Sequence, residues 1–216
     1  MTMHRPTPSG LSAQPLAVQL TRLIGGAAAQ MLDDAAAPQA DLPVLRVAPA
    51  ARALGLQALA VHQTGGPAAR KQALVLYTRC LQHYRRQVQP QLSPGQKGDD
   101  VGPAAAYFVL ANLAALADGE PDDQALPAVE RQMRRLLGAA SGWDHLPLVE
   151  RQQCFEQLAA VGVLVNESRL AARSQGPAAR ANLAQAARGY LHQLLGLEAD
   201  RLSVTSAGLR YNDGLH

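Results

Sequence analysis

The sequence predicts an all-α fold: a single-domain bundle of about six to seven helices around a central apolar helix. Alanine, leucine and glutamine, which favour helices, are abundant among the 216 residues, whereas aromatic residues make up only 4%. Apolar residues recur at helical spacing in one segment after another. Residues 103–117 are uncharged and apolar nearly all round, a pattern typical of a helix that is buried on every side.

A chain of this length can bury a core as one domain. Residues 1–14 are polar and contain prolines, so they are expected to form a disordered lead, and residues 15–216 to form the helical domain. Gly-Pro-Ala-Ala occurs at 66–69, 102–105 and 176–179. The intervals between these copies would hold different numbers of helices, so each copy predicts a helix start rather than a structural repeat.

Prolines and glycines delimit the expected elements. A proline-bearing extended connector is expected from Asp33 to Pro49, and a loop over 90–102. The tail after residue 200 is expected to be an irregular or short strand-like lid, because Leu202–Thr205 is its only β-prone stretch. The expected helices are 15–32, 50–63, 67–88, 103–117, one that ends at Gly138, 147–173 and 177–196.

Residues 67–88 form the clearest amphipathic helix. Its apolar face is predicted to consist of Ala73, Tyr77, Cys80, Leu81, Tyr84 and Val88. The candidate binding residues, for contact with another protein, are its cations Lys71, Arg79, Arg85 and Arg86. Tyr77 and Tyr84 lie opposite most of this charge, so nucleic-acid binding, which uses aromatic residues beside basic ones, is disfavoured.

The net charge of +3 hides a strong segregation. Residues 42–98 hold eight cations and no acid, whereas residues 99–167 hold eleven acids and four arginines. Two interpretations remain open. The basic half binds an anionic partner, or the basic and acidic helices pack side by side and neutralise each other.

No known catalytic or metal-binding motif is present, so we expect no catalytic residue, no metal site and no cofactor. His83 is expected to be solvated, and His145 to belong to a capping and packing group with Trp143 and Asp144. The Asp-Asp pairs at 33–34, 99–100 and 122–123 are expected to cap or end helices. A hydrolase would need carboxylates that converge only in the folded chain.

Asn112 and Asn166 interrupt apolar helices and are expected to form interhelical hydrogen bonds. Cys80 and Cys154 belong to no Cys-x-x-Cys motif and are expected to be buried in the core. No run of about 20 apolar residues predicts a membrane span. The N-terminus is a poor signal peptide, which indicates either a cytoplasmic protein or an export signal that has been removed or replaced.

The second half of the chain resembles a bacterial helical family that is catalogued only as a domain of unknown function. The resemblance covers residues 45–209 approximately. It rests on GDDVGPAAAYFVLANLAAL, VERQMRRLL, VERQQCFEQLAAVGVLV and RGYLHQLLGLEADRLSVTSAGL, in that order. Members of that family typically carry an export signal and have no assigned activity. The resemblance therefore implies a periplasmic or secreted protein and provides no catalytic residue.

Export would put Cys80 and Cys154 in an oxidising compartment, where two inward thiols are able to form a disulfide. The sequence thus leads to three functional hypotheses. The first is a non-enzymatic protein–protein interaction module that is exported from a bacterium. The second is an accessory, adaptor or immunity-type partner of a secretion system or toxin, and the third is the hydrolase.

Overall fold

The computed structural model describes residues 15–16, 20, 24, 28, 32, 45–48, 52–92, 98–120, 122–139 and 142–212. These residues form a mostly α-helical bundle, as predicted. The separate helices are α3 (Leu54–Val61), α4 (Gly66–His83), α6 (Val101–Leu116), α7 (Leu126–Ala139), α8 (Leu148–Gln175) and α9 (Pro177–Leu195). The disordered lead predicted for residues 1–14 lies outside the described residues.

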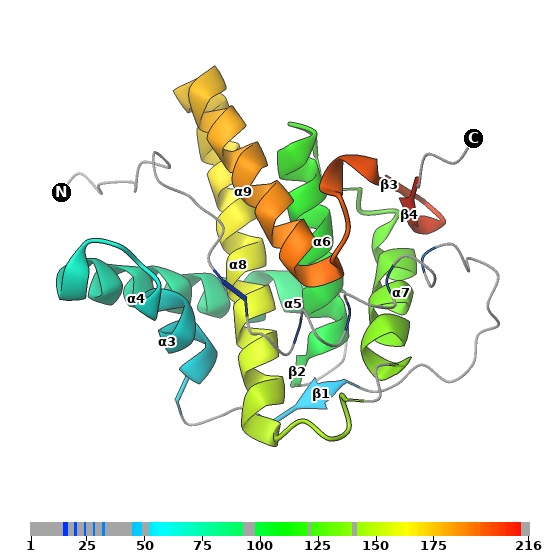
Figure 1. Ribbon diagram of the computed structural model, residues 1–216, viewed down its shortest axis with the longest axis horizontal. Coiled ribbons are helices and arrows are strands. Elements are labelled where there is room, and N and C mark those ends of the chain that lie inside the picture. The colour runs from blue at the N-terminus through cyan, green and yellow to red at the C-terminus, as the bar shows by residue number, and fades with distance from the viewer. Residues whose placement is uncertain are drawn as a thin grey trace.

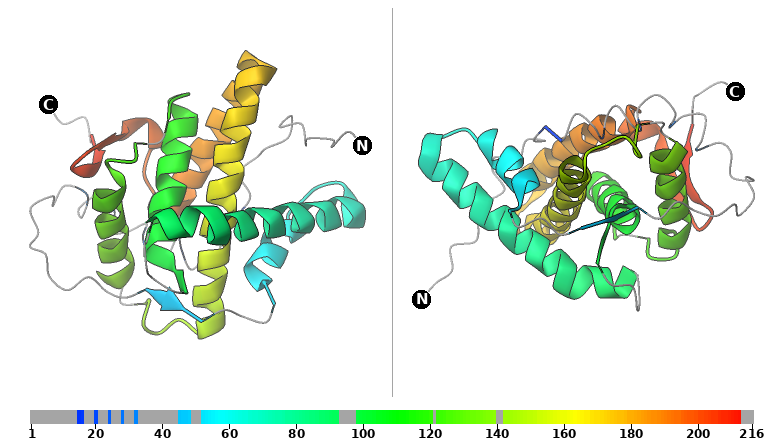
Figure 2. Two further views of the ribbon diagram at one scale, coloured as in Figure 1. Left: turned by 180° about the vertical axis from the view of Figure 1, so that it is seen from behind. Right: turned by 90° about the horizontal axis from the view of Figure 1, so that it is seen from below.

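Helix α6 is the centre of the bundle, and α7, α8 and α9 surround it (Figures 1 and 2). Nearly all of its side chains are buried, with only Tyr107 and Leu116 partly exposed. Phe108 packs edge to face on Tyr190 of α9, with ring centroids 5.9 Å apart. The prediction of a central apolar helix is confirmed, because only a helix with neighbours on all sides can bury such a surface.

Helix α4 crosses α8 at the edge of the bundle, and α3 packs against both of them (Figure 2). Tyr77, Cys80 and Leu81 form its buried face, as the amphipathic pattern predicts. The helix does not end at Val88. It continues as a π-helical turn, η1 (Tyr84–Val88), and then as α5 (Gln89–Leu92), so the predicted loop begins later than expected.

Two small antiparallel strand pairs complete the fold. β1 (Arg46–Val47) pairs with β2 (Asp99–Asp100), which joins the predicted connector to the start of α6. β3 (Leu202–Thr205), the stretch expected to be strand-like, pairs with β4 (Gly208–Tyr211), so of the two expectations for the tail the strand-like one is confirmed. A short 3₁₀ turn, η2 (Ala199–Arg201), precedes it.

Two further contacts join sequence-distant segments, one between α7 and β4 and one from the N–H of Leu16 to Gln193 Oε1 on α9. The side-chain amide of Gln132 on α7 donates to the carbonyl of Leu209 and accepts from its N–H, which anchors β4. Leu20, Ile24, Ala28 and Leu32 are helical and buried, in agreement with the helix predicted there.

The asparagine prediction is wrong for Asn112. Its Nδ2 donates to the carbonyl of Phe108 on its own helix, one turn earlier, rather than to another helix. Asn166 accepts from Arg169 on its own helix and also hydrogen-bonds to Tyr107 of α6, so it does form an interhelical contact.

Candidate functional site

Three buried acidic side chains form two polar clusters that join η1, α7 and α8 to the start of α6. The β1–β2 pair fixes Asp99 and Asp100 directly before α6, and Glu156 comes from the middle of α8. Successive side chains of a strand point to opposite sides, so Asp99 faces Arg85 and Gln152 while Asp100 faces α7.

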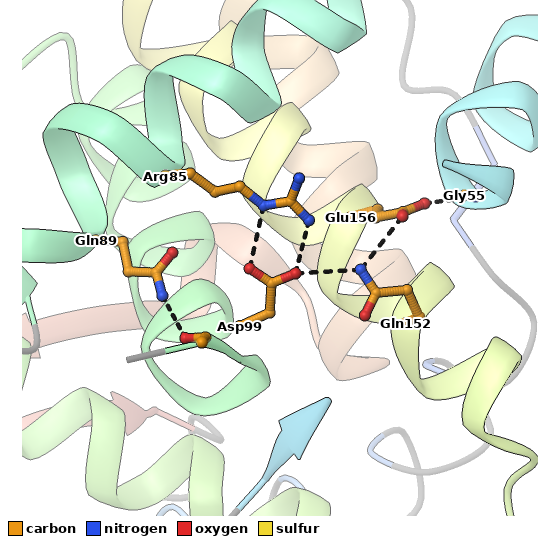
Figure 3. Close-up of polar contacts among 7 residues, drawn as sticks. Gly55, Arg85, Gln89, Asp99, Gln152 and Glu156 are labelled. Carbon is orange, nitrogen blue, oxygen red and sulfur yellow. Dashed lines mark hydrogen bonds and ion pairs between the residues drawn. The ribbon is translucent and has the colours of Figure 1, made fainter. Parts of the chain in front are cut away.

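Asp99 lies at the centre of the first polar cluster (Figure 3). Arg85 of η1 donates through Nε to Oδ1 at 3.1 Å and through Nη2 to Oδ2 at 2.6 Å. Gln152 Nε2 donates to the same Oδ2 at 3.2 Å. The guanidinium of Arg85 also lies over the ring of Phe155, 5.6 Å from its centroid. This two-point ion pair fixes η1 to the beginning of α6.

Glu156 holds α3 against α8. Its Oε2 accepts the backbone N–H of Gly55 at 2.8 Å, and its Oε1 accepts from Gln152 Nε2 at 3.3 Å. Gln157 Nε2 donates to the carbonyl of Gly55. Only 1% of Glu156 is exposed, and this burial raises the pKa of its carboxyl above the ordinary value. Gln152 thus links Asp99 and Glu156 into one continuous network.

Asp100 belongs to a second cluster and performs two tasks. Its Oδ1 accepts the N–H of Gly102 and so caps α6, as predicted for this pair. Its Oδ2 accepts from Arg134 Nη2 at 2.9 Å, and Arg134 Nε donates to Glu130 one turn earlier on α7. The capping prediction is therefore right for Asp100 and wrong for Asp99. Asp122 caps the start of the next helical turn through Gln124 N and Ala125 N.

Tyr84 lies between these clusters and is fully buried. Its ring contacts Tyr107 and Phe155, with centroids 5.8 Å away in both cases. Burial, together with the nearby Asp100 and Glu130, places the pKa of its hydroxyl well above the usual value. This phenol stays protonated at physiological pH, so it is no general base.

The converging carboxylates are occupied by contacts that stabilise the fold. Asp99, Asp100 and Glu156 are buried, and each accepts hydrogen bonds on both oxygens. A hydrolytic pair needs a carboxyl group that reaches substrate or water. This arrangement instead joins helices, and sequence analysis missed it because only the folded chain brings these positions together.

The pocket found in the described part of the chain lies elsewhere, between the C-terminal half of α6 and β3. Its volume is about 210 Å³, and its floor is mainly apolar, with Leu113, Leu202 and Val204 among the lining residues. Two acids lie on its wall. Glu120 forms ion pairs with Arg169 and Arg173, and Asp122 acts as the cap described above.

The structure divides the four predicted binding cations into two groups. Arg85 is bound to Asp99, and 37% of its side chain is exposed. Lys71, Arg79 and Arg86 are exposed along the outer side of α4 and η1, and among the described residues none of them forms an ion pair. We call these three, with Val75 and Gln82 between them, the basic face.

Six of the thirteen acids among the described residues form ion pairs, and all of their partners are arginines. Within the described residues, the charge-neutralisation interpretation holds for Arg85 and Asp99 but for none of the other three cations. The remaining ion pairs are Arg134–Asp100, Arg134–Glu130, Arg169–Glu120, Arg173–Glu120, Arg180–Asp118 and Arg188–Asp200. Positive charge is therefore left over on α4.

The structure also places the other residues that the sequence singled out, namely His83, Trp143 and His145. His83 is exposed, as expected. Trp143 is buried under Arg151, whose guanidinium lies 5.6 Å from the ring centroid and donates to the carbonyls of Asp144 and Leu146. His145 is exposed beside this packed group.

Cys80 and Cys154 are both buried and free, so the disulfide that export would have allowed is not formed in this structure. Burial raises the pKa of each thiol to about 12. Such thiols are poor nucleophiles at physiological pH, because the thiolate is the reactive form.

The described residues contain no candidate metal cluster and no candidate membrane span. No cluster of three or more His, Cys, Asp or Glu side chains is arranged there to hold a metal ion. No helix in the same part of the chain combines the length and apolar character that crossing a membrane requires.

Comparison with curated proteins gives no match, and comparison with solved structures gives none either. A family model does match, over residues 3–212, which is nearly the whole chain. The protein therefore belongs to the family of unknown function DUF6683.

Proposed function

We propose that this protein is a non-enzymatic interaction module that binds another protein through the basic face of α4 and η1. The observation that carries the proposal is the charge of Lys71, Arg79 and Arg86, which are exposed on a segment, residues 66–92, that contains no Asp or Glu, and which form no ion pair among the described residues. An exposed row of like charges without a partner costs the folded chain self-repulsion, which an anionic partner relieves.

The hydrolase hypothesis has one supporting observation, because carboxylates do converge in the fold. Yet Asp99 and Glu156 are buried and fully engaged, and the apolar pocket lies beside a different pair of acids. Binding is the better supported function. Bacterial origin, export, and a role as accessory, adaptor or immunity-type partner of a secretion system or toxin belong to the same proposal and rest on the family resemblance.

The proposal is tested by site-specific crosslinking in the cells that produce the protein. A photoreactive amino acid is placed at Gln82, between Arg79 and Arg86, or at the exposed Gln185 on α9 as the matched control position. A discrete crosslinked protein is expected from position 82 and not from position 185. Its band should disappear when Lys71, Arg79 and Arg86 are all changed to Glu.

A second triple variant controls for net charge. Arg46, Arg131 and Arg210 are exposed and lie outside the basic face, and changing all three to Glu alters the net charge by the same amount. The crosslinked band should persist in this variant. A band that is equally strong from both crosslinker positions, or that is lost equally in both triple variants, would contradict the proposed interaction surface.

A further inference from the structure

The basic face runs along α4 and continues into the π-helical turn η1, where Arg86 lies. Lys71, Val75, Arg79, Gln82 and Arg86 follow one another at intervals of four, four, three and four residues. With a rise of 1.5 Å per residue, the row extends over roughly 22 Å, about four helical turns. The buried residues Tyr77 and Cys80 of α4 and Tyr84 of η1 lie on the opposite side.

This spacing of three and four residues is the spacing at which one helix meets another along a shared seam. The cations stand about two turns apart, and Val75 lies between the first two with 55% of its surface exposed. A surface that complements this row presents carboxylates two turns apart and a small apolar side chain opposite Val75. An α-helix with acids seven or eight residues apart has this geometry.

We infer that the occupant of the basic face is an acidic α-helix of a partner protein, packed along α4 with its carboxylates opposite Lys71, Arg79 and Arg86. This inference rests on the proposed function and names the chemistry of the partner. Charge complementarity supports it, because these cations have no ion-pair partner among the described residues.

Other anionic partners fit the face less well. Single-stranded nucleic acid is bound by aromatic side chains that stack on bases, yet Tyr77 and Tyr84 are buried. A helix that lies on a membrane exposes an apolar face beside its cations, whereas the apolar face of α4 is covered by α3 and α8.

A second copy of this chain is also a poor occupant. Of the acids on the described helices, Glu156 is buried, Glu130 is paired with Arg134, and Glu150 and Glu167 lie seventeen residues apart. No described helix therefore presents two free acids two turns apart, as the basic face requires.

The test uses the full chain and two fluorescent synthetic helices of the same length and composition. In the matched peptide, three glutamates stand seven and eight residues apart with a valine between the first two. In the spaced peptide, the same glutamates are placed at intervals of five residues, so that they point to different sides. A single-stranded oligonucleotide and vesicles with anionic headgroups are measured in parallel.

The matched peptide is expected to bind saturably, and binding should weaken as salt is raised from 50 to 300 mM, about the range over which screening becomes strong. Three partly exposed ion pairs together account for roughly a tenfold change in affinity, so changing Lys71, Arg79 and Arg86 to Glu should weaken binding at least about tenfold. The Arg46, Arg131 and Arg210 variant should bind within about twofold of the unaltered chain.

Three outcomes would overturn the inference. These are the absence of saturable binding, equal affinity for the spaced peptide, and tighter binding of the oligonucleotide or vesicles that depends on the same three cations. Any of them, together with a charge-dependent crosslink at position 82, leaves the interaction module in place and rejects the helical partner. Loss of the crosslink rejects the module itself.

Discussion

Asp99 and Glu156 are neighbours in one network, yet their surroundings differ in charge. Asp99 receives two hydrogen bonds from the cationic Arg85, so its negative charge is balanced directly. Glu156 receives only neutral donors, the N–H of Gly55 and the amide of Gln152, in a buried position. Burial without a cation in contact favours the neutral acid, which explains why its pKa is raised.

This difference predicts a pH dependence of stability. A carboxyl whose pKa is higher in the folded than in the unfolded chain binds more protons when folded. The free energy of unfolding should therefore fall as the pH rises above the ordinary value of 4.5, until the raised pKa is passed. Glu156→Gln should remove this contribution, so its urea-unfolding free energy should decline less between pH 4.5 and 7. Equal slopes for the two proteins would refute the assignment.

For single residues, the sequence predicted which cations face solvent better than it predicted the exact direction of each side chain. The pattern of α4 correctly put Lys71, Arg79 and Arg86 on the solvated side. It also grouped Arg85 with them, because one residue of rotation decides whether the side chain faces solvent or Asp99. The π-helical turn that contains Arg85 has no signature in the residue pattern, since it depends on what lies beneath the helix.

Helix α3 depends on tertiary contacts for its existence. It has only eight residues and no side-chain cap, and isolated helices of this length are marginal in water. Gly55 lets it approach α8 closely: a Cβ at this position would lie 2.8 Å from the backbone oxygen of Gln153 and 3.0 Å from the Glu156 carboxylate. The glycine is required by this contact rather than by its backbone angles.

Gly55→Ala is therefore expected to separate α3 from α8 and to cost about 1–3 kcal/mol in the free energy of unfolding, the usual penalty of overpacking. The matched control is Gly119→Ala, where no atom lies within 4 Å of the added methyl group. Chemical denaturation of both variants measures the difference. A Gly55→Ala protein as stable as the Gly119→Ala protein would show that α3 can move aside freely.

Helix α6 offers a graded test of central burial. Phe108 is fully enclosed and packs edge to face on Tyr190, so Phe108→Ala should cost about 3–5 kcal/mol. Leu113 borders the pocket next to β3, where the surroundings are already open, so Leu113→Ala should cost about 2–3 kcal/mol. Thermal and urea unfolding compare the two variants, and a larger loss for Leu113 would mean that α6 is not centred as described.

Among the elements, the helices and strand β3 were predictable, whereas β1, β2 and β4 were not. Proline, glycine and 3.6-residue periodicity located α6, α7, α8 and α9 to within a few residues, because these signals are local. The β1–β2 pair joins Arg46 to Asp100, and two residues are too few for any alternation to be visible. Only the first strand of the hairpin was predicted, because β3 contains the β-branched residues Val204 and Thr205, whereas β4 contains no β-branched residue.

At the scale of the whole molecule, both cysteine thiols are buried in the interior. Cys80 and Cys154 are buried, and each pKa of about 12 leaves almost no thiolate at pH 7.5. A thiol reagent should therefore modify the native protein at least about a hundredfold more slowly than the urea-unfolded protein, in which two thiols per chain react at once. Rapid labelling of the native protein would indicate that α4 separates from α8 readily.

The arrangement of the whole molecule could be predicted from one sequence feature, the uncharged segment that forms α6. Its lack of any polar side required neighbours all round, and the amphipathic helices supplied them. The buried polar network was beyond the reach of this reasoning. Asp99 and Gln152 are 53 residues apart, and either one alone resembles an ordinary helix-terminal or surface residue.

The β3–β4 hairpin determines when the fold can be completed as the chain is synthesised. Gln132 is buried, and both atoms of its amide bond to Leu209, which is synthesised 77 residues later. Until that segment leaves the exit tunnel, α7 presents an amide with no partner beside an uncovered apolar surface. A chain truncated before β4 should therefore be retained by chaperones, whereas a chain that contains β4 should be released from them.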